Sequence, residues 1–338
     1  MTLAGEYRAV RAWLDGCRRP LIVTHRRPDG DALGAVAAMS RALAQLGLSP
    51  AAVLFEPLPA RYYLLADMVP WRHWDKDGEE LRREADAVVI VDTCSWSQLE
   101  PVADWLANAP RTLVIDHHST RDPVATRPGD LRVFDETAAA VCLMVAEWIE
   151  VAGILLDPPL ATALLVGMAT DTGWFRFPST DARLLRMAAQ MVEAGAPPAP
   201  VHRYIHEQEP PEKLRLIGRM LTSMELLAGG RLVVLKLRRA DFAATGADNA
   251  MTEDLVNEAG RLARSEVIVL FTEEADGRVR VNLRSKQAVD VSALASRFNG
   301  GGHARAAGAR PQGSWDEVVT AVTAAILAEL ERPAAAMQ

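Results

Sequence analysis

The stretch that decides the fold is residues 21–35, LIVTHRRPDGDALGA, in which a short apolar run leads through a loop with proline and glycine into a helical stretch ending near Leu46. Apolar runs of the same kind recur at 51–55, 87–92 and 112–116. Continuous apolar runs that alternate with helices are typical of strands covered on both faces of a parallel sheet. We therefore predict that the first half of the chain is an α/β domain built on a mostly parallel sheet.

The remaining sequence continues this organisation into a second domain. Residues 137–194 read as three helices, and a segment rich in proline follows them. Because 338 residues suit two domains, we predict an N-terminal domain at 1–194, a linker at 195–213 and a smaller α/β domain at 214–338. The second domain is predicted to contain strands at 231–237, 266–271 and 278–284 and helices at 211–227, 250–264, 290–298 and from 315 onward.

Composition and charge exclude several classes of protein. Apolar residues make up 49% of the chain and charged residues 24%, which excludes a disordered or coiled-coil protein. The net charge of −7 argues against binding long nucleic acid through bulk positive charge. It is still compatible with binding a small anion in a local basic pocket. The three cysteines form no CxxC pair, and the sequence shows no signal or membrane-spanning segment. We therefore expect a cytoplasmic protein with buried cysteines.

The loop after the first predicted strand carries three side chains of the kinds that bind metals. His25, Asp29 and Asp31 lie within seven residues, and Pro28 and Gly30 force a tight turn between them. In open α/β sheets ligands bind at the carboxyl ends of the strands, which is where this loop begins. A mixed set of oxygen and imidazole ligands suits Mn²⁺, Mg²⁺ or Fe²⁺, so we predict a metal site here.

Three further loops carry the same residue types. Asp92 ends an apolar strand, Asp116, His117 and His118 end and follow the next, and Asp171 ends an apolar helix. Asp92 taken alone is compatible with a helix cap. Adjacent imidazoles are rarely core filler, because each needs its own buried partner. One shared site explains four such loops on one α/β unit better than four separate structural roles.

The second half of the chain contains a basic segment. Residues 278–310 hold seven lysines and arginines against a single acid, Asp290. Arg284 offers a guanidinium fork for a phosphate, and glycines 300–302 beside His303 let a phosphate approach the backbone amides. A glycine run on its own is equally compatible with a flexible turn. Its combination with His303 and Arg284 favours an anion site.

These motifs, in this order, resemble those of the DHH phosphoesterases over about residues 15 to 330. The motifs that carry the resemblance are HRRPDGDALG (25–34), VDT (91–93), DHH (116–118), TDTGWFRF (170–177), VNLRSK (281–286) and NGGGHARAAG (299–308). The fourth and the last are most similar to those of oligoribonucleases that also act as 3′-phosphoadenosine-5′-phosphate (pAp) phosphatases. The resemblance implies a DHH catalytic domain followed by a DHH-associated substrate-binding domain, with the active site in the cleft between them.

The resemblance also implies two divalent metal ions, most suitably Mn²⁺. Two ions about 3.5–4 Å apart can clamp an in-line displacement at phosphorus. One ion is expected on His25, Asp29 and Asp92, and the other on Asp31, Asp92, His117 and Asp171, so that Asp92 bridges them.

The implied catalytic residues are Asp92, Asp116 and His118. Asp116 is expected to orient a ligand imidazole, and His118 to contact the scissile phosphate or to protonate the leaving oxygen. Trp174, Phe175 and Phe177 can stack a base, although core packing of at least one ring is the stronger expectation. The implied substrate-binding residues are Phe175, Arg176, Arg284, Ser285, Gly300, Gly301, Gly302 and His303.

The expected reaction is hydrolysis of RNA of about two to five nucleotides to nucleoside monophosphates, with pAp to AMP as a second reaction. The expected partner is short RNA, a dinucleotide or pAp. We expect no binding to a membrane and no stable complex with long nucleic acid. A homodimer is compatible with the sequence. The main alternative is a phosphodiesterase of linear or cyclic dinucleotides such as c-di-AMP, pApA or pGpG. A pyrophosphatase or exopolyphosphatase fits two of the motifs poorly, a RecJ-like exonuclease fits the charge poorly, and a catalytically silent nucleotide-binding regulator conflicts with the intact acids.

Overall fold

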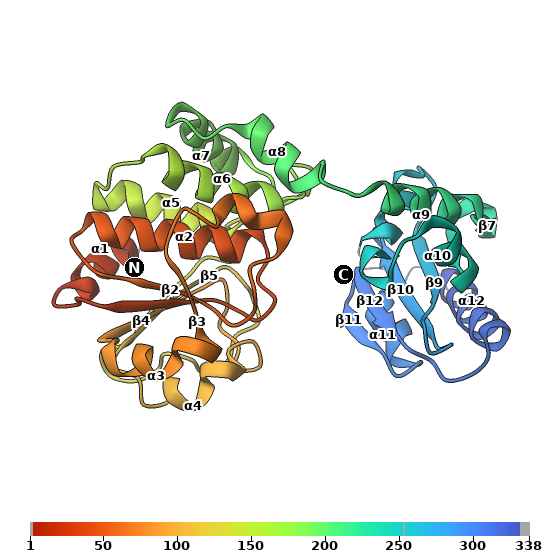
Figure 1. The fold of residues 1–338 in the computed structure, drawn as a ribbon, viewed down its shortest axis with the longest axis horizontal. Coiled ribbons are helices and arrows are strands. Elements are labelled where there is room, and N and C mark those ends of the chain that lie inside the picture. Colours follow the sequence, from red (N-terminus) through yellow and green to blue (C-terminus); the bar gives the residue numbers. More distant parts are fainter. Residues whose placement is uncertain (1–2, 253, 332–338) are drawn as a thin grey trace. The chain divides into compact units, whose positions relative to one another are not determined.

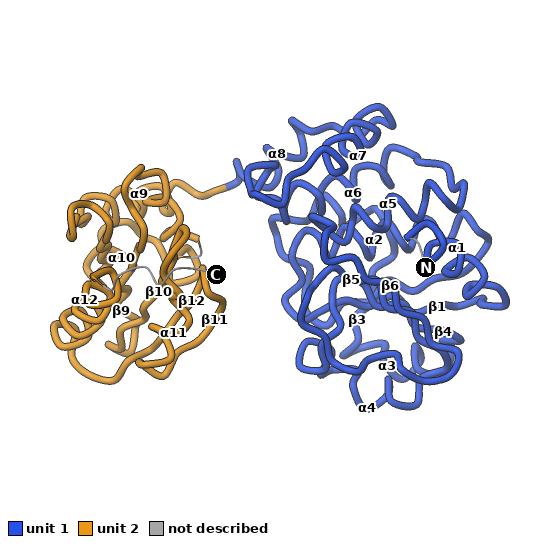
Figure 2. Tube along the Cα trace, turned by 180° about the vertical axis from the view of Figure 1, so that it is seen from behind, with its two compact units in different colours: residues 1–208 blue, residues 209–338 orange. Residues whose placement is uncertain are grey.

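The computed structural model describes residues 3–252 and 254–331 and divides into two compact units, residues 1–208 and 209–338 (Figures 1 and 2). Within the segment predicted as a linker, α8 (Pro198–His206) is a helix of the first unit, where it packs against α6 (Pro158–Asp171) and the 3₁₀ helix η1 (Ala60–Leu65). Prolines in the first turn of a helix are tolerated because the amides there have no helical partner. Because of its proline-rich composition, the segment was predicted as a linker and this helix was not predicted.

The first unit contains the predicted parallel sheet, with strand order β3-β2-β1-β4-β5-β6 and every neighbouring pair parallel. The two edge strands were not predicted, because both are short and only partly apolar. The strands are β1 (Pro20–Val23), β2 (Ala51–Leu54), β3 (Trp71–His73), β4 (Ala87–Val91), β5 (Thr112–Asp116) and β6 (Leu131–Phe134).

Helices cover both faces of this sheet, which explains why its central strands are apolar throughout (Figure 1). On β4, Val89 and Val91 face the core under α1, α2, α5 and α6, whereas Val88 and Ile90 face the core under α3 and α4. The covering helices are α1 (Leu3–Leu14), α2 (Gly30–Gln45), α5 (Val141–Ala152) and α6 (Pro158–Asp171) on one side, with α7 (Ala182–Glu193) outside them, and α3 (Trp74–Glu84) and α4 (Ala103–Leu106) on the other.

The second unit is a second α/β unit, as predicted, with a mixed sheet of order β11-β12-β10-β9-β8-β7 in which only β8 and β9 pair in parallel. One face packs against α11 and α12, and the other against α9, α10 and two 3₁₀ helices. Its elements are α9 (Pro211–Thr222), β7 (Glu225–Leu227), β8 (Leu232–Leu237), α10 (Arg239–Thr245), η4 (Asn249–Thr252), η5 (Leu255–Arg261), β9 (Val267–Glu273), β10 (Val279–Ser285), α11 (Val291–Ser296), β11 (Gly301–His303), β12 (Ala306–Ala309) and α12 (Trp315–Glu331).

The predictions for two helices of this unit were wrong in part. The helix expected at 250–264 is the pair of 3₁₀ helices η4 and η5, which bury Leu255, Val256 and Ala259, the same apolar residues whose spacing suggested an α-helix. The helix expected at 211–227 ends at Thr222, and its last three residues form the edge strand β7 (Glu225–Leu227).

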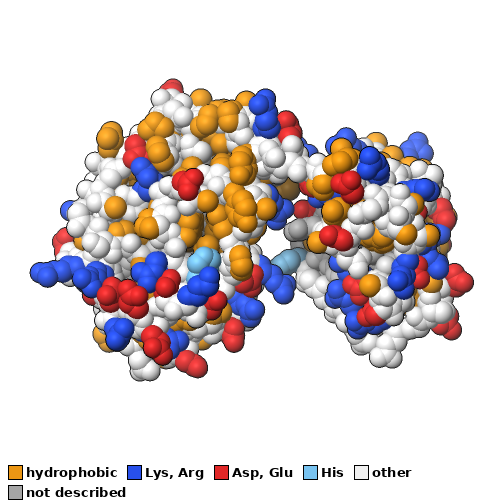
Figure 3. All heavy atoms as spheres, viewed as in Figure 1, with side chains coloured by type: hydrophobic (Ala, Val, Ile, Leu, Met, Phe, Trp, Pro, Cys, Tyr) orange, Lys and Arg blue, Asp and Glu red, His pale blue; other side chains and the backbone are white. Residues whose placement is uncertain are grey.

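Three global features bear on the expectations from composition and sequence. Among the residues that the structure describes, no helix combines the length and apolar character needed to cross a membrane. Acidic and basic side chains are interspersed over the visible face of each unit (Figure 3). All three cysteines are free and buried, as predicted.

Candidate metal centre and anion-binding cavity

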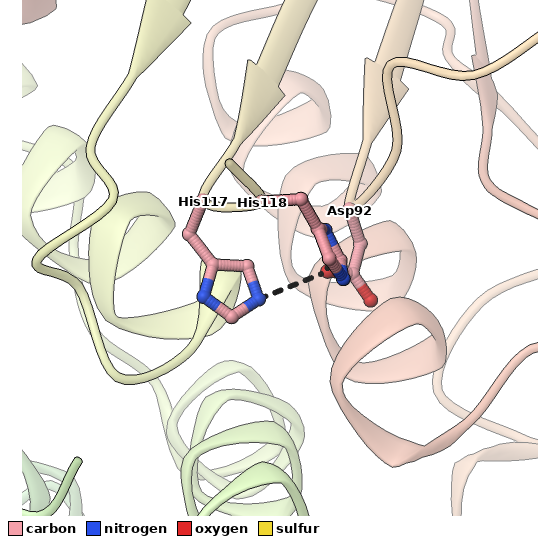
Figure 4. Close-up of side chains that lie close together, drawn as sticks. All are labelled: Asp92, His117 and His118. Carbon is pink, nitrogen blue, oxygen red and sulfur yellow. Dashed lines mark ion pairs between the residues drawn. The ribbon is translucent and has the colours of Figure 1, made fainter. Parts of the chain in front are cut away.

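Asp92 lies at the centre of the polar cluster at the carboxyl edge of the first sheet. It follows β4 directly, has a left-handed backbone with φ of 63°, and donates its amide to the Ile115 carbonyl at 3.0 Å. This turn aims the carboxylate toward the loops after β1 and β5, and Figure 4 shows it beside His117 and His118. A left-handed backbone is uncommon outside glycine, and its use here fits a side chain that must be placed exactly for function.

Each carboxylate oxygen of Asp92 faces a different imidazole. His25 Nε2 lies 3.5 Å from Oδ2 and His117 Nε2 lies 3.5 Å from Oδ1, and the same nitrogen of His117 lies 3.6 Å from Asp171 Oδ2. Asp92 Oδ1 is buried and accepts no hydrogen bond within the described part of the chain. A buried carboxylate oxygen without a donor requires compensation, which a cation between these groups would provide.

The remaining carboxylates concentrate acidic groups in a buried place. Asp31 is buried, and burial together with the charges of Asp92 and Asp171 raises its pKa well above the ordinary value. Burial likewise raises the pKa of Asp171 to about 6. Burial lowers the pKa of His25 and of His117, but the Asp92 carboxylate outweighs it and raises these pKa values to about 9 and about 10. The cluster thus attracts positive charge, which protons or divalent cations can supply.

Backbone groups hold the candidate ligands in place. The amides of Val141 and Cys142, at the start of α5, donate to Asp31 Oδ2 at 2.6 Å and to Oδ1 at 2.9 Å. Because a carbonyl only accepts, the Ala138 carbonyl 3.0 Å from His117 Nδ1 places the proton on Nδ1 and leaves Nε2 free to bind a metal.

The loop after β1 is organised in the same way. The Arg26 carbonyl lies 2.8 Å from His25 Nδ1, so His25 also presents Nε2. Asp29 is the N-cap of α2, where its Oδ1 accepts the amides of Asp31 and Ala32 at 3.0 Å. The predicted tight loop therefore brings its three side chains to the end of the sheet, with Asp29 exposed and Asp31 buried.

Among the residues that the structure describes, three groups of side chains could hold a metal ion, each with ligand atoms within 4.8 Å of one another. Two of them contain most of the residues predicted for the two ions, and the third shares Asp92 and His117 with those sets. The groups are His25, Asp29 and Asp92; Asp31, His117 and Asp171; and Asp92, His117 and His118.

His118 is held differently from the other two histidines. Its Nδ1 donates to Asp116 Oδ1 at 2.8 Å, its amide donates to the same oxygen at 3.2 Å, and Asp116 is fully buried. This hydrogen bond raises the pKa of His118 above the ordinary value, although burial opposes it. The side chain is 55% exposed, so Nε2 is available to a substrate. The pair has the arrangement of an acid–base histidine oriented by a carboxylate. Asp116 was expected to orient a ligand imidazole, but it bonds to His118, because the Nδ1 of the predicted ligand His117 faces the Ala138 carbonyl.

The loop after Asp171 forms a left-handed turn. Gly173, Trp174 and Phe175 have φ values of 56°, 61° and 61°. Trp174 and Phe175 pack against the core, which confirms the expectation that at least one of these rings is core-packed, whereas Phe177 is half exposed. Arg176 is exposed, and its Nε donates to the Gly173 carbonyl at 2.7 Å.

In the second unit, the β-sheet register brings Arg284 and His303 to one face. Ala306 on β12 pairs with Arg284 on β10 and with His303 on β11, and directly opposed residues share a face. Two of the predicted glycines are explained by packing within this hairpin: a Cβ on Gly300 would contact the Gly308 carbonyl, and one on Gly302 would lie 2.5 Å from the Ala306 carbonyl.

Gly301 and Ser285 differ in what they offer a ligand. Gly301 is exposed and faces open space, so its backbone is accessible. The Ser285 hydroxyl donates to the Val289 carbonyl at 2.6 Å and lies 3.2 Å from the Ala304 carbonyl. Ser285 therefore holds the loops beside Arg284.

Sequence reasoning missed a cavity of about 430 Å³ beneath the 3₁₀ helices. Arg280, Asn282 and Arg284 are alternate residues of β10 and so share the face that lines it, a period-two signal that the sequence does contain. Burial lowers the pKa of both arginines, and neither forms an ion pair with another described residue. Arg280 Nε is buried without a partner there. The lining residues are Asn249, Ala250, Thr252, Asp254, Val256, Arg280, Asn282 and Arg284.

Comparison with known proteins agrees with this geometry. Residues 19–168 match the model of the DHH family, N-terminal domain, and residues 229–331 match that of the DHHA1 domain. A protein of Thermus thermophilus described as a bifunctional oligoribonuclease and PAP phosphatase NrnA is 31% identical over 316 residues, which cover 92% of this chain and 90% of that protein. The chain belongs to the DHH family. The predicted family and its activity, hydrolysis of phosphoester bonds, are thereby confirmed.

Two further relatives extend the comparison. A Bacillus subtilis protein with the same NrnA description is 28% identical over 317 residues, covering 92% of this chain and 93% of that protein. The crystal structure of an exopolyphosphatase-related protein from Bacteroides fragilis has a TM-score of 0.86 at 21% identity and covers 96% of each chain. That likeness shows that the DHH-family chain described here shares its fold.

Proposed function

We propose that this DHH-family chain is a metal-dependent enzyme that hydrolyses RNA of about two to five nucleotides to nucleoside monophosphates and converts pAp to AMP. The observation that carries the proposal is Asp92, whose two oxygens each lie 3.5 Å from a different imidazole. Similarity over most of the chain to proteins described as oligoribonucleases and PAP phosphatases supports this choice of substrates.

The donor set of the first unit fits two divalent cations, which we propose to be Mn²⁺. Buried carboxylates, imidazole nitrogens and the Asp92 Oδ1 that accepts no hydrogen bond match the preference of Mn²⁺ for mixed oxygen and nitrogen ligands. When bound, the ions would supply positive charge beside the phosphorus and lower the pKa of water. The residues proposed to hold them are His25, Asp29 and Asp92 for one ion, and Asp31, Asp92, His117 and Asp171 for the other.

His118 and Asp116 are proposed to supply the proton that the leaving oxygen takes up. In hydrolysis a water molecule loses a proton as its oxygen forms a new bond to phosphorus, the bond to the leaving oxygen breaks, and that oxygen takes up a proton. His118 Nε2 is exposed and can donate this proton, while Asp116 fixes the tautomer and stabilises the imidazolium form.

The second unit is proposed to bind a phosphate away from the reacting one. Arg280 and Arg284 offer guanidinium groups without ion-pair partners among the described residues, in a cavity large enough for a nucleotide. Gly301 and His303 lie on β11, which β12 separates from β10 in the same sheet, and Phe175 and Arg176 follow Asp171 in the first unit. A local anion site suits short substrates and a chain of net charge −7. The expected cytoplasmic location and homodimer stay predictions.

A substrate panel with Mn²⁺ tests this proposal. The panel contains labelled RNA of about 2 to 24 nucleotides, pAp, linear and cyclic dinucleotides, and pyrophosphate. We expect turnover of the shortest RNAs and of pAp, falling steeply with length. Preference for cyclic dinucleotides or pGpG would establish the dinucleotide phosphodiesterase instead, whereas preference for pyrophosphate or equal turnover of long strands would refute the short-RNA assignment.

A further inference from the structure

Arg183 on α7 connects two acids that belong to different elements. Its Nε and Nη2 donate to the two oxygens of Glu147 at 2.5 and 2.6 Å, and its Nη1 donates to Asp135 Oδ2 at 2.7 Å. A guanidinium fork holds a carboxylate in a fixed orientation in this way, which lysine cannot do. Arg183 therefore fixes the position of Asp135 relative to Glu147.

Each acid is itself anchored to its surroundings. Asp135 begins the loop after β6, where its Oδ1 accepts the amide of Thr137 at 3.0 Å and the hydroxyl of Thr137 at 2.6 Å. Glu147 lies in the middle of α5 and also accepts the Tyr7 hydroxyl at 2.9 Å. Within the described part of the chain, Arg183 is the only cation paired with either carboxylate.

The segment between these acids holds two candidate metal ligands through its backbone. The Ala138 carbonyl accepts from His117 Nδ1, and the Val141 and Cys142 amides donate to Asp31. All three backbone groups lie between residues 135 and 147, the points that Arg183 clamps. A shift of this segment would therefore move the partners of both ligands together, although Arg183 itself contacts neither.

We propose that Arg183 is a positioning residue of the metal centre: by pairing with Asp135 and Glu147 it holds the intervening segment where its backbone orients His117 and Asp31. This role rests on the proposed metal-dependent function. Loss of groups that orient metal ligands weakens metal affinity by about 10- to 100-fold. The structure thus assigns a function in metal binding to a residue on an outer helix.

Mn²⁺ affinity of the full chain tests the proposal, measured from the electron paramagnetic resonance signal of free Mn²⁺ at a temperature where circular dichroism shows each variant to be folded. We expect Arg183→Ala to weaken Mn²⁺ binding about tenfold or more, and Arg183→Lys to weaken it less. Asp135→Asn keeps an acceptor for Thr137 but removes the charge that pairs with Arg183, so it should also weaken Mn²⁺ binding. These two milder variants keep the test decisive if Arg183→Ala does not fold.

Arg127→Ala is the matched control. Arg127 pairs with Asp130 at 3.2 Å, and Asp130 accepts the amide of Thr112 at the start of β5, the end of that strand away from Asp116. This control should lower the melting temperature without changing Mn²⁺ affinity. Unchanged affinity in the Arg183 and Asp135 variants, or an equal loss in Arg127→Ala, would overturn the positioning role alone. Absence of Mn²⁺ binding by the wild-type chain would overturn the proposed metal dependence as well.

Discussion

Gly167 on α6 packs directly against the carboxylate of Asp31 on α2. A Cβ atom at Gly167 would lie 2.5 Å from Asp31 Oδ1 and would also overlap Cys142 Sγ. The glycine thus lets α6 approach closely enough for Asp171, at the end of the same helix, to join Asp31 and His117 in one group. Helix packing and the metal centre therefore depend on the same contact.

Gly167→Ala should consequently displace Asp31. We expect Mn²⁺ affinity to fall about tenfold or more and stability to fall by about 1–3 kcal/mol, because the added methyl group overpacks a buried contact. Gly218→Ala on α9 is the control, since a Cβ there meets nothing within 4 Å. It should be neutral or stabilise the chain by up to about 1 kcal/mol. Equal effects of the two substitutions on Mn²⁺ binding would contradict this account.

Asp92→Asn should abolish most Mn²⁺ binding and turnover while leaving the fold intact. Asparagine tolerates the left-handed φ of 63° at this position, so the substitution removes the charge without straining the turn. Metal titration and circular dichroism on the same sample separate the two effects. Full activity in this variant would show that Asp92 does not bridge the ions.

His118→Ala should lower kcat by about 100-fold or more and leave Mn²⁺ affinity within a few fold, because His118 is proposed to donate a proton. Asp116→Asn should lower kcat by about tenfold through loss of the preferred tautomer. In the alternative to proton donation, His118 is itself a metal ligand, together with Asp92 and His117. A large loss of Mn²⁺ binding in His118→Ala would support that alternative.

Arg280→Ala and Arg284→Ala should each raise KM about tenfold or more for substrates that end in a phosphate, with kcat nearly unchanged, because each removes a charged hydrogen-bond donor from the cavity. Steady-state kinetics with pAp and a phosphorylated dinucleotide measure both constants. Arg278→Ala is the control: Arg278 precedes the same strand but is exposed and pairs with Asp276. A KM unchanged by the first two substitutions would remove the cavity from the substrate site.

The pair of Arg41 and Asp157 should make stability depend on pH. Burial raises the pKa of Asp157, but the hydrogen bonds from Arg41 and from the Leu160 amide outweigh it, so the pKa of the folded state lies below the ordinary value. A lowered carboxyl pKa stabilises the fold above the unfolded pKa of about 3.9, and this stabilisation is lost as the pH falls through the folded pKa.

Asp157→Asn keeps the acceptor that caps α6 and removes the charge. Its melting temperature should therefore be lower than that of the wild type at pH about 7, and the difference should shrink below pH about 4. Calorimetry of the metal-free chain across this range measures the difference. A difference that stays constant or grows on acidification would refute the role of the ion pair.

The parallel sheet and its polar carboxyl edge could be predicted from the sequence because both are local patterns. Runs such as 87–91 are apolar at every position, as a strand buried on both faces requires, and each run leads into an acid or a histidine. The histidine and aspartate loops were predicted in the same way, because Pro28 and Gly30 constrain a turn whatever surrounds it. The edge strands and α8 escaped prediction because their apolar patterns are short or interrupted.

The sequence by itself determined the fold class, the family and the set of acids and histidines that meet at one edge of the sheet. Only the tertiary structure decided how they are held. The start of α5 holds Asp31, the Ala138 carbonyl holds His117, and Arg183 holds the segment between Asp135 and Glu147 that carries these backbone groups. The physical reason is that each of these contacts joins residues at least 21 positions apart, and Asp31 and Val141 are 110 apart. Local patterns specify which side chains a loop carries, whereas helix packing and strand register decide what each one faces.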